Sequence, residues 1–120
     1  MYSLLDPTRA QDFAMDDEQL LSLVDTFEAS LVKELQALAQ AAQAADADQL
    51  HRLLHSLKGY LPFLCAAAVC ETVTQLDNRV RQSPEQVAQV VPGVLALLPQ
   101  LHTLQSEIAT WKARYHSGKA

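Results

Sequence analysis

The chain has 120 residues and a net charge of −5, with 49% apolar and only 6% aromatic side chains. This length suits one domain, residues 1–120, and the unclustered basic residues offer no positive patch for DNA or RNA. No apolar run approaches the roughly 18 to 20 residues that span a bilayer, and the N-terminus lacks the basic segment of a signal peptide. We therefore expect a soluble, cytoplasmic domain without membrane or nucleic-acid partners, in which the two cysteines are reduced.

The predicted elements are helices, beginning with two in the first third of the chain. Asp6-Pro7 is a helix-start signal and predicts a short helix to about Phe13. The carboxylates at 16–18 suit the N-terminus of a long second helix. Its apolar stripe runs for about seven turns and consists of Leu20, Val24, Phe27, Leu31, Leu35, Leu38 and Ala42. A break is expected at 44–48, with Asp46 or Asp48 capping the helix that follows.

Three further helical segments complete the chain. One carries the stripe Leu50, Leu53, Leu54, Leu57 and Leu61 and should end near Pro62. The next begins near Leu64 and carries Val69, Val73, Leu76 and Val80. Ser83-Pro84 then predicts an N-cap and a proline at the first helical position, with Gln86 as the capping-box partner. The last segment extends to about Tyr115 and should kink or restart at Pro92-Gly93 and bend again at Pro99, because each proline removes a backbone donor.

Alternating strand patterns are absent from the sequence. Four long helices with short connections predict an all-α fold, an antiparallel four-helix bundle with a short N-terminal cap helix. Trp111 and Tyr115, four residues apart, are expected to pack the last helix against the others.

His55 is the residue that points to chemistry. At about 100° per residue, it lies roughly 150° from the centre of the leucine stripe and therefore faces solvent. Lys58, one turn further on, can place an ammonium group beside an anion that forms on the ring. Gly59 costs a helix about 1 kcal/mol relative to alanine, so its presence predicts that something large approaches the backbone there. The alternative is an ordinary solvated histidine.

His55-Ser56-Leu57-Lys58-Gly59 resembles the H-x-L-K-G signature of histidine-containing phosphotransfer (HPt) domains, the shuttles of bacterial phosphorelays. The resemblance covers about residues 6–115, including the order and lengths of the helices. It implies that His55 accepts a phosphoryl group from an aspartate of a response-regulator receiver domain and passes it to another receiver. A hybrid sensor histidine kinase is the implied upstream partner.

The resemblance also implies a carrier that has no cofactor of its own, since the receiver supplies Mg²⁺. We expect a monomer, with dimerisation through the last helix as the alternative. Autokinase activity is not expected, because the sequence holds no Gly-rich phosphate loop. One departure from the family is the bulky segment 60–65, where small residues are common.

Further roles around His55 follow from the same resemblance. Asp77 fits the position of an acidic residue that accepts a hydrogen bond from the other ring nitrogen, an ordinary exposed carboxylate being the alternative. His51 either lines the site or merely solvates the helix face. A docking patch for the receiver would consist of the apolar residues Leu21, Leu23 and Val24, with Arg52 at its rim. The alternative is that the three apolar residues all face the core.

Other functions remain open at this point. The bundle would act as a pure interaction module if it docked a receiver or kinase without carrying phosphate. His51 and His55, at i and i+4, have the spacing of metal ligands, but two ligands are too few, and no metal site is predicted. Cys65 and Cys70 fall on different sides of a helix and are expected to be core thiols. His102 and His116 are expected at the surface or in interhelix hydrogen bonds.

Overall fold

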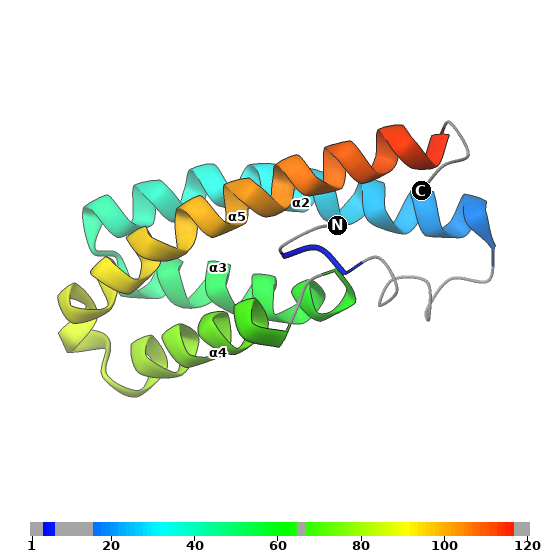
Figure 1. Ribbon diagram of the computed structural model, residues 1–120. Helices are drawn as coiled ribbons and strands as arrows, with labels where there is room; N and C mark the ends of the chain where they lie inside the picture. The colour runs from blue at the N-terminus through cyan, green and yellow to red at the C-terminus, as the bar shows by residue number, and fades with distance from the viewer. Residues whose placement is uncertain (1–3, 7–15, 65–66, 117–120) are drawn as a thin grey trace.

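The helices lie antiparallel in an elongated bundle (Figure 1). The computed structural model describes residues 4–6, 16–64 and 67–116, without the side chain of residue 116. Its helices are α2 (Asp17–Ala44), α3 (Ala47–Tyr60), α4 (Ala67–Gln82) and α5 (Val87–His116), with 3₁₀ turns η1 (Leu61–Phe63) and η2 (Pro84–Gln86). The prediction of an all-α helical bundle is confirmed for these residues, whereas the predicted cap helix at 7–13 lies outside them.

A tight turn between α2 and α3 sets them antiparallel. The Asp16 carboxylate caps α2 by accepting from the backbone N–H of Gln19 at 2.8 Å, and Asp46 caps α3 by accepting from that of Gln49 at 3.2 Å. Ala45 between the two helices has a φ of 49°, the left-handed conformation that commonly ends a helix. Of the two cap candidates in the sequence, the structure selects Asp46.

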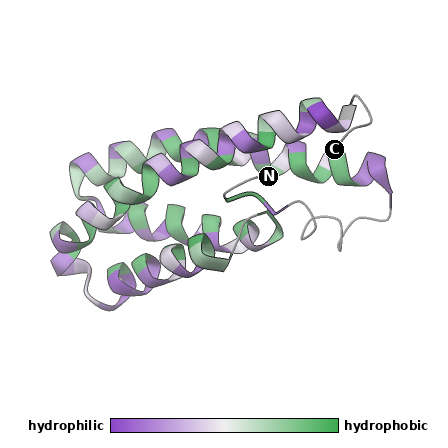
Figure 2. Ribbon diagram, viewed as in Figure 1, coloured by the Kyte–Doolittle hydropathy of each residue, from purple (hydrophilic) through white to green (hydrophobic). Residues whose placement is uncertain are grey.

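The core is built from one apolar stripe per helix, and Figure 2 shows hydrophobic positions recurring along each of the helices. Leu31, Leu50 and Leu101 are among the fully buried side chains. The bulky segment after α3 joins this core. Tyr60 and Phe63 both stack on Phe27 of α2, with ring centroids 5.3 Å and 5.7 Å apart. The large residues that depart from the family pattern therefore pack against α2 and extend the core beyond the end of α3.

The last helix starts differently from the prediction. Ser83 stands at the N-cap of η2, but its side chain makes no capping hydrogen bond in the described structure; instead its carbonyl accepts from the N–H of Gln86 at 2.9 Å. The prediction of a capping box between Ser83 and Gln86 is therefore wrong. A 3₁₀ turn with proline at its start forms instead and leads directly into Val87.

Helix α5 continues unbroken through Pro92 and Pro99, so a restart at Pro92-Gly93 is wrong. The other predicted outcomes, a kink at Pro92-Gly93 and a bend at Pro99, stay predictions. Each proline removes the donor that would reach the carbonyl four residues earlier, at Ala88 and Leu95. All four residues are exposed. Water can therefore satisfy the two carbonyls, and burial of the opposite face keeps the segment helical.

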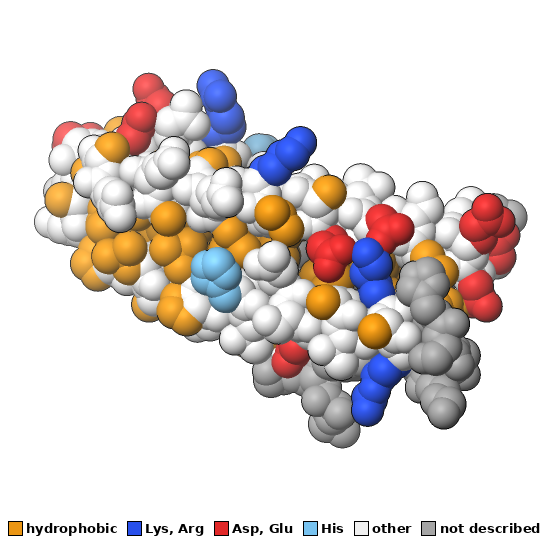
Figure 3. Space-filling view, turned by 90° about the horizontal axis from the view of Figure 1, so that it is seen from above, with side chains coloured by type: hydrophobic (Ala, Val, Ile, Leu, Met, Phe, Trp, Pro, Cys, Tyr) orange, Lys and Arg blue, Asp and Glu red, His pale blue; other side chains and the backbone are white. Residues whose placement is uncertain are grey.

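Residues Pro84–Tyr115 are long and apolar enough to cross a membrane by length and composition alone. The sequence expectation of no such run is thus wrong. Core helices of bundles pass the same test, and the inner face of this one, including Val94 and Leu104, is completely buried. Some apolar surface is left outside, where Figure 3 shows apolar side chains gathered over one half of the α2–α5 face. Val32 and Leu95, which are 40% and 49% exposed, lie on these two helices.

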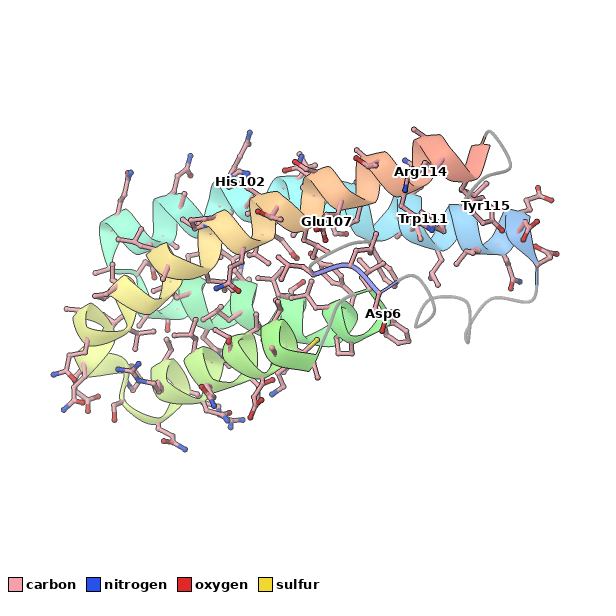
Figure 4. The ribbon with its side chains drawn as sticks, viewed as in Figure 1. Asp6, His102, Glu107, Trp111, Arg114 and Tyr115 are labelled. Carbon is pink, nitrogen blue, oxygen red and sulfur yellow. The ribbon has the colours of Figure 1, made fainter. Side chains whose placement is uncertain are left out.

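The C-terminal half of α5 is fixed by contacts with residues 4 and 5 and with the N-terminal half of α2 (Figure 4). The Glu107 carboxylate accepts from the backbone N–H groups of Leu4 and Leu5, both at 2.9 Å. Trp111 is buried in the core and Tyr115 packs against it, as predicted, and their ring centroids are 4.9 Å apart.

Polar side chains also tie this half of α5 to α2. Lys112 bridges Asp25 and Glu28, and its hydrogen bonds to these two carboxylates raise its pKa. The hydrogen bond from Tyr115 to Asp17 raises the pKa of the phenol.

Candidate functional site

The packing of α3 determines where His55 points. Leu50, Leu54 and Leu57 are fully buried and fix the rotation of the helix about its axis. With these leucines inward, His55 lies on the outer side next to α4, and 65% of its side chain is exposed. The predicted solvent-facing orientation of the imidazole is confirmed.

Asp77 of α4 is the chemical partner that the packing brings to this face. It is 0% exposed, the only buried polar or charged residue found in the part of the chain that the structure describes. Its Oδ1 lies 2.7 Å from Nδ1 of His51, and its Oδ2 lies 3.6 Å from Nδ1 of His55. The alternative of an exposed carboxylate is therefore wrong, and the hydrogen bond goes to His51 instead of His55.

The two histidines lie one above the other on α3. Their ring centroids are 5.7 Å apart, as the spacing of four residues requires. His51 is the less exposed of the two, at 41% of its side chain. It therefore lines the same site, because it shares the Asp77 carboxylate with its neighbour, and is not simply a solvated surface residue.

Lys58 adds a positive charge to the site. Its Nζ lies 3.7 Å from Oδ2 of Asp77, and 34% of its side chain is exposed. Both His55 and Lys58 are thus near Oδ2 but beyond hydrogen-bonding distance. This buried oxygen has no hydrogen-bond partner among the described residues.

Gly59 leaves an opening on the outer face of α3. A Cβ built at this position would meet nothing within 4 Å in the described structure. Internal packing therefore does not require glycine here. Arg52, seven residues earlier, is exposed on the same face of the helix.

The opposite side of the site is anchored by a residue that the sequence analysis missed. Glu34 of α2 accepts hydrogen bonds from Ser56 and, at 2.5 Å, from the hydroxyl of Tyr60. These contacts hold α3 against α2 immediately beside His55. The sequence carries no signal for them, because they depend on the register between two helices.

The predicted docking patch does not form around His55. Val24 is only 3% exposed and belongs to the core, so its assignment to the patch is wrong. Leu21 and Leu23 are half-buried and pack against the core. Because Phe27 stacks on the last residue of α3, residues 21–24 lie roughly 12 to 17 Å from His55 along the bundle axis.

The other reactive side chains lie apart from His55. Cys70 is half-buried and packs against the core, as expected for a core thiol, while Cys65 lies outside the described residues. His102 is exposed on α5, and the side chain of His116 is outside the described structure. No group of three or more His, Cys, Asp or Glu side chains is placed to hold a metal among the residues that the structure describes.

The chain matches a known protein family. The model of the Hpt domain matches residues 22–112, well over half of the chain, and this range includes α3, α4 and the whole site around His55. No curated protein and no solved structure gives a significant match.

Proposed function

Because the chain belongs to the Hpt domain family, we propose that it is a phosphorelay intermediate that carries the phosphoryl group on His55. The family implies phosphotransfer in two-component signalling, in which Hpt domains act with receiver domains and kinases. The observation that carries the proposal for this residue is its position. His55 is an exposed imidazole within the H-x-L-K-G pattern and lies beside a buried carboxylate.

The geometry around His55 favours one ring nitrogen as the nucleophile. Nδ1 faces Asp77, so Nε2 is the nitrogen left for an incoming phosphoryl group. Its lone pair forms the N–P bond while the bond from phosphorus to the receiver aspartate breaks and leaves a carboxylate. The proton on Nδ1 stays in place during this step. The negative charge of Asp77 offsets the positive charge that the ring acquires.

Positioning and charge supply the remaining catalysis, as phosphoryl transfer generally requires. Nζ of Lys58 lies 3.7 Å from Asp77, beyond hydrogen-bonding distance, so its ammonium group can turn and donate to a phosphoryl oxygen. Gly59 leaves space for the backbone of a receiver domain to approach. The receiver supplies Mg²⁺ with its aspartyl phosphate, so this chain needs no cofactor of its own. We place the protein in the cytoplasm, where receiver domains and the kinase domains of hybrid sensors meet.

The test is transfer from a panel of phosphorylated receiver domains in the presence of Mg²⁺. We expect the wild type to take up phosphate from a cognate receiver and His55→Gln to take up none. His102→Gln is the matched control, because His102 is equally a solvent-facing histidine on a helix of the same bundle. Uptake by His55→Gln at the normal rate would overturn the proposal. Binding to a receiver without any transfer would favour a docking module instead.

A further inference from the structure

The two oxygens of Asp77 have different surroundings. Oδ1 accepts the hydrogen bond from His51, whereas Oδ2 is buried and has no hydrogen-bond partner in the described structure. A buried acceptor without a partner is unfavourable, so a state of the protein that supplies one is stabilised. The candidate donors near Oδ2 are the ring of His55 and the ammonium of Lys58.

We propose that His51 is a positioning residue, which fixes the Asp77 carboxylate so that Oδ2 can accept a hydrogen bond from Nδ1 of His55. The inference rests on the proposed function, because it assigns a role in phosphotransfer at the same site. A carboxylate bonded through one oxygen to a donor on α3 cannot rotate freely about its Cβ–Cγ bond. With Oδ1 committed to His51, the second oxygen faces along α3 toward the next turn, where His55 and Lys58 lie.

This arrangement prepares the site for the phosphorylated form. Once Nε2 of His55 is bonded to phosphorus, Nδ1 carries the ring proton and is a donor. A ring movement of about 0.5 Å brings the 3.6 Å separation from Oδ2 into hydrogen-bonding range. The bond would satisfy the buried oxygen in the phosphorylated state. His51 thereby favours phosphorylation without touching the phosphoryl group.

Substitutions at position 51 separate this role from simple packing. Asparagine places an amide N–H the same number of bonds from Cβ as Nδ1 of histidine, glutamine places it one bond further out, and leucine offers no donor. We expect His51→Leu to slow phosphoryl uptake from a receiver by at least about tenfold, as small misplacements of reacting groups do. His51→Asn should remain within about threefold of the wild type, with His51→Gln between the two.

A second readout works without phosphate. The ¹⁵N shifts of the His55 ring in the unphosphorylated protein report which nitrogen carries the proton and what it bonds. We expect them to change in His51→Leu and to return toward the wild-type values in His51→Asn, with unchanged helix content by circular dichroism.

Equal uptake rates in all four proteins, or equal losses in the asparagine and leucine variants, would overturn the positioning role. Absence of uptake in the wild type would instead count against the proposed function, and the ring shifts would still test how His51 and Asp77 act on His55.

Discussion

Substituting Gly59 by alanine separates the stability of the fold from its proposed function. The added methyl group would meet nothing within 4 Å in the described structure, and the position is exposed on α3. Removal of a helical glycine should therefore stabilise the protein by about 0.5 to 1 kcal/mol. If a receiver approaches the backbone at this point, the same methyl group should lower the rate of phosphoryl uptake by about tenfold, the equivalent of about 1.4 kcal/mol.

Gly93 of α5 is the matched control. Its added Cβ would lie 2.7 Å from Cδ2 of Leu76, inside the contact between α5 and α4. Because Cδ2 is the end of the flexible Leu76 side chain, that side chain must shift to make room, and the crowding should offset part or all of the gain in helix propensity. Urea unfolding followed by circular dichroism should thus show a larger rise in the midpoint for Gly59→Ala than for Gly93→Ala. Destabilisation of Gly59→Ala, or its unchanged uptake of phosphate, would refute the reasoning for Gly59.

Two further predictions concern contacts between α2 and its neighbours. Lys112→Gln should lower the free energy of unfolding by ~0.5 kcal/mol at neutral pH, because ion pairs near the surface contribute little to stability. Asp25 and Glu28 raise the pKa of Lys112 above 10.5 in the folded protein. The contribution of Lys112 to the free energy of unfolding is therefore complete below pH 10.5 and is lost as the pH rises through the folded-state pKa. Unfolding measurements at several pH values would reveal this loss. Glu34→Ala removes the carboxylate that accepts from the part-buried hydroxyl of Tyr60, and this should lower the free energy of unfolding by about 1 kcal/mol. Adding Tyr60→Phe should recover part of that loss in the same unfolding assay, and no recovery would show that this hydroxyl is not the cause.

The sequence predicted most of the helices because their apolar stripes repeat with the helical period. The leucines of α3 and the exposed direction of His55 follow from the same periodicity, and the structure agrees with both. The capping aspartates were readable because they act on backbone only three residues away. The local rule for proline failed at Pro92, where a restart was one predicted outcome but the helix is continuous, because tertiary packing decides there.

The site was predictable only in part, for a related reason. The H-x-L-K-G pattern lies on one helix, so its members were identified together. Asp77 lies on the next helix, and only the packing of α4 on α3 shows that it is buried and that it bonds His51. The pairing of Glu34 with Ser56 depends likewise on interhelix register.

The most direct test of the account is to locate the phosphate after the protein has been incubated with Mg²⁺ and a phosphorylated cognate receiver. A phosphoramidate is labile in acid and stable in alkali, whereas phosphate on a serine hydroxyl is stable in acid. The account predicts one acid-labile, alkali-stable phosphate per chain, which tandem mass spectrometry at neutral or alkaline pH assigns to the peptide that contains His55. Acid-stable phosphate, or phosphohistidine on any other peptide, would contradict it.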